Sequence, residues 1–302
     1  MQDVVAVVVT YDRLELLKRC IRCLQEQTTS CDVVVVDNAS PQSTKSWLAA
    51  EAERWPALRV RTLTTNTGGA GGFNCGIQWA VQTGYRYIWL MDDDCLPHPD
   101  ALNKLLETSA ALGGPDKYGF LSSAVLWTDG SECLMNRQKP VKVSRQVHLP
   151  AQLTQVEQAT FVSLFLPART IRKAGLPISQ YFIWGDDIEY TRRIAVRQAC
   201  PSYLVRNSRV VHAMAKNTGS SIATDDLARL ERYTLACRNE SFTYRQEGLS
   251  GFVRYTGRRI RDLWNIIWRA RGNRLKRITA LFKGVFLGLT FHPEIEFLQS
   301  SN

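Results

Sequence analysis

Three consecutive carboxylates, Asp92, Asp93 and Asp94, follow the strand-like apolar run 85–91. Carboxylates this close together repel one another unless a cation or a proton compensates their charge. A hard divalent ion such as Mn²⁺ or Mg²⁺ prefers oxygen ligands and is the simplest compensation. Because alternate residues of a strand point the same way, we expect Asp92 and Asp94 to share an ion while Asp93 faces elsewhere. The alternative is a solvated acidic turn.

Strand-like and helix-like segments alternate along the first third of the chain. β-Branched runs such as Val4–Val9 are typical of strands buried on both faces. The alternation predicts an α/β fold, a parallel sheet with helices on both faces. The predicted strands are 4–9, 33–36, 58–63 and 85–91, and the predicted helices between them are 14–27, 44–54 and a segment around 73–81.

Polar residues follow the ends of these predicted strands. The four that stand just past a strand end are Tyr11, Asp37, Asn66 and Asp92. Ligands of parallel sheets bind in the crevice outside the carboxyl ends of the strands, so we expect these side chains to converge there. A D-x-D pair beside such a crevice suits a substrate that carries a diphosphate.

A glycine-rich stretch, 67–72, opens the third predicted helix. Glycines such as Gly68 and Gly69 let backbone N–H groups approach a ligand closely, at a helix N-terminus that favours phosphate. The spacing is neither a Walker loop nor a good Rossmann fingerprint, because it follows the third strand and lacks G-K-[S/T]. The alternative is a tight strand-to-helix turn.

A second acidic pair, Asp186-Asp187, lies among aromatic residues in the stretch 181–190. A partly apolar pocket would raise the pKa of a carboxylate toward the value that a general base needs. Trp184 could stack on the apolar face of a sugar ring. The alternative is a helix N-terminus, where the helix dipole favours acidic residues.

Among the four histidines, only His212 follows a short strand-like segment and precedes a loop of small residues. It could be a third metal ligand beside two aspartates, or a structural histidine with its hydrogen bonds satisfied.

The composition narrows the class of protein. With 302 residues and 45% hydrophobic residues the chain can bury a core, which argues against disorder. Eight cysteines without a repeating pattern do not predict a disulfide framework, and Cys20 and Cys23 fit an apolar helix face. We expect a reducing cytosol, no secretory signal and no membrane span.

The net charge of +10 concentrates near the C-terminus. Ten cations fall in 251–284 and only Asp262 opposes them, while apolar residues repeat at helical spacing up to residue 290. Basic amphipathic helices with tryptophans predict binding of residues 251–290 to an anionic membrane. The alternative is a helical hairpin packed on the rest of the protein with solvated charges. No nucleic-acid-binding fold accompanies the charge, so we expect no nucleic acid partner.

Five motifs, in this order and at strand ends, resemble those of a GT-A fold, family 2 glycosyltransferase. They are V-T-Y-x-R at 9–13, V-V-D-N-A-S at 35–40, the glycine run at 66–72, M-D-D-D at 91–94 and W-G-D-D-I-E-Y at 184–190. The resemblance covers about residues 4 to 215 and is closest to the galactofuranosyltransferase branch, with rhamnosyltransferases as near neighbours. It implies a Rossmann-like nucleotide-sugar-binding sheet with helices on both faces, followed by a helical region.

The resemblance also implies roles for individual residues. Asp187 would be the catalytic base, and Trp184 and Asp186 would contact the acceptor. Asp92, Asp94 and His212 would hold Mn²⁺ or Mg²⁺. Arg13 would lie near the diphosphate and Asp37 would accept a hydrogen bond from the uracil ring. The residues implied for donor binding are Thr10, Tyr11, Arg13, Asp37, Asn66, Gly68, Gly69, Asp92 and Asp93.

The sequence therefore predicts a GT-A catalytic domain over 1–220 and a helical C-terminal region over 221–302. We expect an inverting, metal-dependent hexosyltransferase that moves galactofuranose from its UDP donor to a lipid-linked or polysaccharide acceptor in cell-surface polysaccharide synthesis. Its expected location is the cytoplasmic face of the cell membrane, peripherally bound. The alternatives are a rhamnosyltransferase that uses dTDP-rhamnose, and a non-catalytic basic protein that binds membrane or nucleic acid on a degenerate transferase fold.

Overall fold

The computed structural model describes residues 2–141 and 149–298. Its N-terminal half contains a parallel four-stranded arrangement in the order β3-β2-β1-β4, built from the most apolar runs of the chain. These strands are β1 (Val4–Thr10), β2 (Asp32–Asp37), β3 (Leu58–Thr62) and β4 (Tyr87–Asp92). All seven residues of β1 are buried, as expected for a strand covered on both faces.

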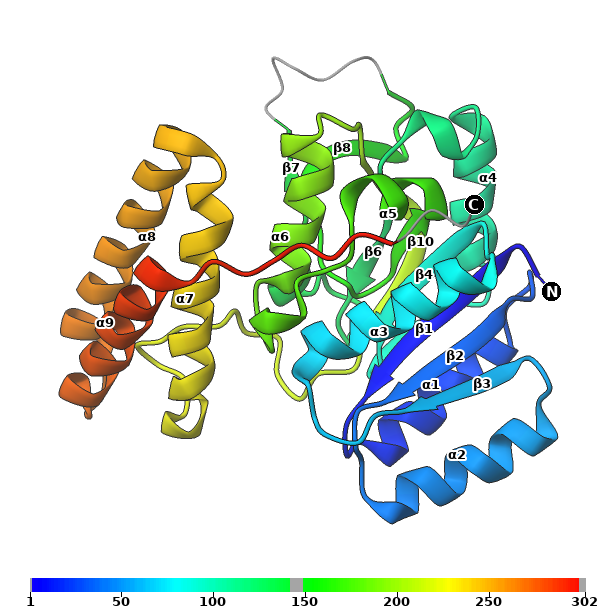
Figure 1. Ribbon diagram of the computed structural model, residues 1–302, viewed down its shortest axis with the longest axis horizontal. Coiled ribbons are helices and arrows are strands. Elements are labelled where there is room, and N and C mark those ends of the chain that lie inside the picture. Colours follow the sequence, from blue (N-terminus) through cyan, green and yellow to red (C-terminus); the bar gives the residue numbers. More distant parts are fainter. Residues whose placement is uncertain (1, 142–148, 299–302) are drawn as a thin grey trace.

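Helices cover both faces of this sheet (Figure 1). One face packs against α1 (Leu14–Gln25), α2 (Gln42–Arg54) and α4 (Ala101–Ala111). The other face packs against α3 (Gly68–Thr83) together with the shorter α5 (Ala168–Ala174) and α6 (Asp186–Arg192). Alternate valines of β1 point into the two cores, as the period of a strand requires.

The four strands predicted to be parallel are parallel, and further strands make the full sheet mixed. The strand β9 (Leu164–Pro167) lies between β4 and β6 (Leu121–Leu126) and is antiparallel to both. The long strand β10 (Tyr203–His212) is parallel to β6. The remaining strands are β5 (Cys95–Pro97), β7 (Lys139–Pro140) and β8 (Leu153–Gln158), and both β5 and β8 pair antiparallel with β10.

Three helices stand together beside this layered part of the chain: α7 (Leu230–Arg245), α8 (Gly248–Arg269) and α9 (Arg274–Thr290) (Figure 1). After α9, the segment 291–298 runs back over the sheet-bearing part, where the Leu176 N–H donates to the Glu296 carbonyl over 2.8 Å. The boundary between 1–220 and 221–302 stays a prediction. No helix among the described residues is long and apolar enough to cross a bilayer.

Apolar side chains on α8 and α9 point away from the protein. The helix α9 packs on α7 through small residues, since a Cβ atom at Gly284 or Gly288 would meet Thr234 or Ser241. The large apolar residues of the two helices that remain between 43% and 79% exposed are Leu249, Phe252, Val253, Ile260, Trp264, Ile267, Trp268, Leu275, Phe282, Phe286 and Leu289. Most of the predicted apolar stripe therefore faces outward and does not pack against the rest of the protein.

Candidate active site

The three aspartates lie at the carboxyl end of β4, next to the end of β1. The strand ends at Asp92, and Asp93 and Asp94 form a turn that leads into β5. Asp92 and Asp94 do lie near each other, but the turn brings them together and not the alternation of a strand. Asp93 faces β1, where its Oδ2 accepts a hydrogen bond from the Thr10 hydroxyl at 2.7 Å.

The pairing of β5 with β10 places His212 beside Asp94. His212, the last residue of β10, is in register with Cys95, and its Nε2 lies 3.0 Å from Asp94 Oδ1. Its Nδ1 lies 2.7 Å from Asn136 Oδ1. Since the amide oxygen only accepts, the proton on Nδ1 is fixed there and Nε2 is left to share a cation with Asp94.

The pKa values of this cluster show that it needs a positive charge. Burial, and after it the charge of Asp94, raises the pKa of Asp92 to about 7. Burial lowers the pKa of His212, but the hydrogen bonds to Asp94 and Cys133 and the charges of Asp94 and Asp92 together outweigh it, and the pKa rises to about 10. Although burial acts against it, the contacts with His212 and Arg13 hold the pKa of Asp94 below its usual value.

These residues fit a divalent ion. One ligand atom from each of Asp92, Asp94 and His212 lies within 4.8 Å of the other two. No hydrogen bond among the described residues reaches the Asp92 carboxylate, so its oxygens are available. The 3.0 Å between His212 and Asp94 matches the roughly 3 Å between adjacent ligands of an octahedral ion at about 2.1 Å. Two carboxylates and one imidazole suit Mn²⁺ or Mg²⁺.

Arg13 joins the cluster from the loop after β1. Its Nη1 lies 2.6 Å from Asp94 Oδ2 and 3.3 Å from Asp93 Oδ1. Burial raises the pKa of Asp93 to about 6 in spite of this contact. Half of the Arg13 side chain is exposed, so the guanidinium can turn toward a ligand in the crevice. Tyr11, two residues before it, is also half exposed.

The acidic pair Asp186-Asp187 forms the first turn of α6, as the helix N-terminus alternative describes. The Asp187 Oδ1 accepts a hydrogen bond from the Ile188 N–H at 2.7 Å. Burial raises the pKa of Asp187 to about 7. The hydrogen bond from Ile188 lowers this pKa, and the charge of Asp92 raises it further. Burial and the charge of Asp187 raise the pKa of Asp186 to about 8. Asp187 therefore lies within electrostatic reach of the metal cluster and has the pKa of a general base.

The glycine run packs tightly against the protein. Gly68 has φ +71°, and a Cβ atom there would overlap the backbone of Phe182. Two of the first amides already have partners, since Gly68 N donates to Asn66 Oδ1 at 2.8 Å and Ala70 N donates to the Phe182 carbonyl at 3.1 Å. This supports the tight-turn alternative. Gly69 is different, because no atom lies within 4 Å of its Cβ position.

The end of β2 contributes Asp37 and the neighbouring Asn38. Asp37 Oδ1 accepts from the Ser40 N–H at 2.9 Å, while its buried Oδ2 has no partner among the described residues. An unpaired buried acceptor fits the expected donor, a base N–H. Asn38 donates to Asn66 Oδ1 at 3.1 Å and to the Gly68 carbonyl at 2.9 Å, and so joins the exposed Asn66 to the glycine run.

Trp184 is partly buried and contacts two residues of the C-terminal region, and its role toward the acceptor stays a prediction. Its ring packs edge-on against Tyr233 with 4.9 Å between centroids, and the Arg229 guanidinium lies 5.2 Å from the ring centroid. The structure therefore gives Trp184 a packing role between the stretch before α6 and the start of α7.

The sequence predicted no role for two residues of the site, Asn136 and Asn239. Asn136 orients His212, and Asn239 of α7 binds backbone carbonyls beside Trp184. Their contacts join residues 76 and 55 positions apart. A single asparagine in an irregular segment or a helix belongs to no spacing pattern, so these contacts could not be predicted from the sequence.

Residues 5–113, which contain the three aspartates and the glycine run, match the family model described as Glycosyl transferase family 2. Over these residues the chain carries a glycosyltransferase family 2 domain. The match contains four of the five motifs and confirms the family resemblance there, while the motif at 184–190 lies outside it. Intact aspartates at the crevice argue against a degenerate transferase.

Curated proteins that are similar to this chain are named as sugar transferases. The galactofuranosyltransferase GlfT1 of Mycolicibacterium smegmatis is 29% identical over 213 residues, which are 66% of this chain and 67% of the relative. The undecaprenyl-phosphate mannosyltransferase of Micrococcus luteus is 34% identical over 104 residues. That match spans 34% of this chain and only 43% of the relative.

Solved structures confirm the GT-A fold of the transferase. The mannosyltransferase PcManGT of Pyrobaculum calidifontis, in complex with GDP-Man and Mn²⁺, aligns with a TM-score of 0.58 at 17% identity. The alignment covers 95% of this chain and 80% of that one. At this identity the likeness concerns the fold alone.

Proposed function

We propose that this protein is an inverting, metal-dependent transferase that moves galactofuranose from UDP-galactofuranose to a lipid-linked glycan acceptor in cell-surface polysaccharide synthesis. The observation that carries the proposal is the gathering of Asp92, Asp94 and His212 within reach of Asp187 in a family 2 chain. The GlfT1 relatives, which are named galactofuranosyltransferases, support the donor sugar.

The proton of the acceptor hydroxyl goes to Asp187. A carboxylate with a pKa of about 7 is ionised in a useful fraction near neutral pH and is basic enough to accept that proton during attack. The hydroxyl oxygen then displaces the UDP group in one step, which inverts the anomeric carbon without a covalent enzyme intermediate. Asp186 is placed beside the acceptor by its position in the same helical turn.

The donor lies between the strand ends and the aspartates. The Asp37 carboxylate would accept the N3–H of uracil, and Arg13 would turn from Asp94 toward the diphosphate. Thr10 holds Asp93 in place. When bound at Asp92, Asp94 and His212, Mn²⁺ or Mg²⁺ supplies positive charge that offsets the charge developing on the departing diphosphate.

The test of the base is the variant Asp187→Asn. It should reduce sugar transfer at least 100-fold while the affinity for UDP stays within twofold, because the amide keeps the shape but takes no proton. Near-normal turnover would remove Asp187 from this role. The alternative dTDP-rhamnose donor is tested by titrating UDP and dTDP in parallel, since tighter dTDP binding would favour rhamnose.

We further propose that α8 and α9 bind the anionic cytoplasmic face of the cell membrane, where a lipid-linked acceptor resides. Glu240 and Glu247 pair with Arg254, Arg258 and Arg259, so more acidic groups oppose the basic cluster than Asp262 alone. The buried Arg277 donates to the carbonyls of Ile222 and Asp225. The exposed cations without an ion pair among the described residues of this segment are Arg261, Arg269, Arg271, Arg274, Lys276 and Lys283. Free cations beside outward apolar side chains support an interfacial helix pair.

A further inference from the structure

The turn before α6 has an unusual backbone. Phe182, Trp184 and Gly185 have φ angles of 63°, 62° and 91°. Only glycine adopts this left-handed region without strain, so two bulky residues there need support from their surroundings. The helix that carries Asp186 and Asp187 begins at the next residue, which means that this turn sets the position of both carboxylates.

Asn239 of α7 supplies support from one side. Its side-chain Nδ2 donates to the carbonyls of Tyr181, Ile183 and Trp184 at 3.1, 3.2 and 2.8 Å. Asn239 is fully buried, and Arg238 holds its Oδ1 from Nε at 3.0 Å and Nη2 at 2.8 Å. The amide is therefore locked in the orientation that presents its N–H groups to the turn.

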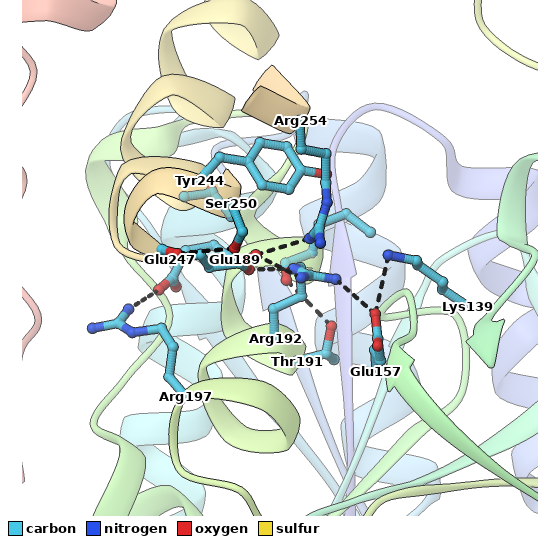
Figure 2. Close-up of polar contacts among 12 residues, drawn as sticks. Lys139, Glu157, Glu189, Thr191, Arg192, Arg197, Tyr244, Glu247, Ser250 and Arg254 are labelled. Carbon is cyan, nitrogen blue, oxygen red and sulfur yellow. Dashed lines mark hydrogen bonds and ion pairs between the residues drawn. The ribbon is translucent and has the colours of Figure 1, made fainter. Parts of the chain in front are cut away.

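The glycine run supports the turn from the other side. The carbonyl of Phe182 points away from Asn239 and accepts the Ala70 N–H at the start of α3. The turn is thus held between α3 and α7. The far end of α6 is tied as well, because Arg192 binds Glu247 with two hydrogen bonds of 2.6 and 2.8 Å (Figure 2). Glu247 stands immediately before α8, so the C-terminal helices contact α6 at both ends.

We propose that Asn239 is a positioning residue for catalysis, which holds the turn 181–185 and so sets Asp187 relative to Asp92. The C-terminal helices then complete the active site in addition to their membrane role. This inference rests on the proposed role of Asp187 as base. Asn239 itself touches no reacting atom, and it acts through the backbone that precedes α6.

Hydrogen exchange tests the contact without any substrate. In Asn239→Ala, amides in 181–192 should exchange at least tenfold faster than in the unchanged protein, while UDP binding with Mn²⁺ stays within twofold. The matched control is Ser241→Ala, which removes another α7 side chain that donates to a backbone carbonyl, that of Gly288 on α9. Unchanged exchange in 181–192, or equal acceleration in the control, would overturn the inference.

A milder variant covers the case in which Asn239→Ala does not fold. Arg238→Gln leaves the Asn239 amide in place but removes its support, and it changes a side chain that is only half buried. We expect the same segment, 181–192, to lose protection, by a smaller factor. Full protection in Arg238→Gln would contradict the locked amide.

Turnover shows whether Asn239 acts through Asp187. The assay measures release of UDP from UDP-galactofuranose in the presence of Mn²⁺, with water as the acceptor. The rate, divided by the concentration of protein that binds UDP, should be at least tenfold lower in Asn239→Ala. In the Asp187→Asn background the same change should cause no further loss, whereas independent effects would multiply. If Asn239→Ala turns over normally while Asp187→Asn is slow, the positioning role of Asn239 is overturned and the base is not. Normal turnover of Asp187→Asn would overturn the base and this inference together.

Discussion

Arg13 Nη1 lies 2.6 Å from Asp94 Oδ2, so a guanidinium occupies a carboxylate that the proposed metal ion would also use. His212 holds the other oxygen of the same carboxylate. Metal binding and the Arg13 contact therefore compete for Asp94. When a diphosphate enters, Arg13 gains a new anionic partner and Asp94 becomes free for the ion, which couples donor binding to metal binding.

This competition predicts opposite effects in Arg13→Ala. The affinity for Mn²⁺ alone should rise several-fold, because the rival cation is gone, while the affinity for UDP in the presence of Mn²⁺ should fall about tenfold. Calorimetric titration of each ligand measures both. Arg19→Ala is the matched control, since Arg19 is exposed on α1 and its removal changes the net charge equally. Weaker Mn²⁺ binding in Arg13→Ala would contradict the competition.

The glycine run offers a second matched pair. Gly68→Ala should lower the free energy of unfolding by about 1–3 kcal/mol or more, because Gly68 has φ +71° and its Cβ would overlap Phe182. Gly69→Ala should be neutral or raise it by about 0.5 kcal/mol, since the Cβ position is open. If the Gly69 amide binds the donor phosphate, Gly69→Ala should also weaken UDP binding. Equal unfolding energies in urea would refute the close approach at Gly68.

The pH dependence of stability follows from Asp186. Its pKa rises to about 8 by burial and the charge of Asp187, so the folded protein holds this proton more tightly than the unfolded chain does. Stability should therefore fall as pH rises from about 4 to about 8 and level off above. Asp186→Asn removes this loss and should be more stable than the unchanged protein by roughly 2 kcal/mol at pH 8, with little difference at pH 4.

Urea unfolding in EDTA at the two pH values measures this effect. The control is Asp3→Asn, which alters an exposed aspartate. A stability gain in Asp186→Asn that is the same at both pH values would mean that the carboxyl proton is not its cause. The gain in stability should come with a loss of transfer activity, because a buried acidic pair costs stability and such pairs cluster at functional sites.

The outward face of α8 predicts membrane binding that depends on tryptophan. Trp264 and Trp268 are 62% and 66% exposed, and removing both as serines should weaken binding to vesicles rich in phosphatidylglycerol at least tenfold. Leu134→Ser, at an apolar residue 40% exposed outside these helices, should bind normally. Vesicle flotation measures retention, with phosphatidylcholine vesicles for comparison. Equal retention of the double variant would place the contact elsewhere, and no retention of the unchanged protein would end the membrane proposal.

Much of the N-terminal half was predictable because its physics is local. A run such as Val4–Val9 has no stable place except a buried strand, and polar residues after it must lie at the sheet edge. Asp92, Asp94 and His212 were expected together, and the structure places them together. The structural reason differs from the one expected. A turn brings the two aspartates together, and the pairing of β5 with β10 places the histidine beside them.

The parts that were not predictable depend on contacts between distant segments. The antiparallel β9 enters the sheet between β4 and β6, and nothing in a short apolar run specifies its direction. Arg229 and Tyr233 contact Trp184 from a part of the chain far along the sequence, and the sequence does not reveal these contacts. Asn239 donates to backbone carbonyls of the turn 181–185. Every residue has such a carbonyl, so the side chains of the turn do not reveal this contact.

The most direct test of the account is calorimetric titration of UDP into the unchanged protein and into Asp94→Asn, each with and without Mn²⁺. We predict UDP binding that tightens at least tenfold with Mn²⁺ in the unchanged protein, and no metal effect in Asp94→Asn. The variant Asp100→Asn, at an exposed aspartate before α4, should behave like the unchanged protein. UDP affinity that ignores Mn²⁺, or a full metal effect in Asp94→Asn, would contradict the proposed site.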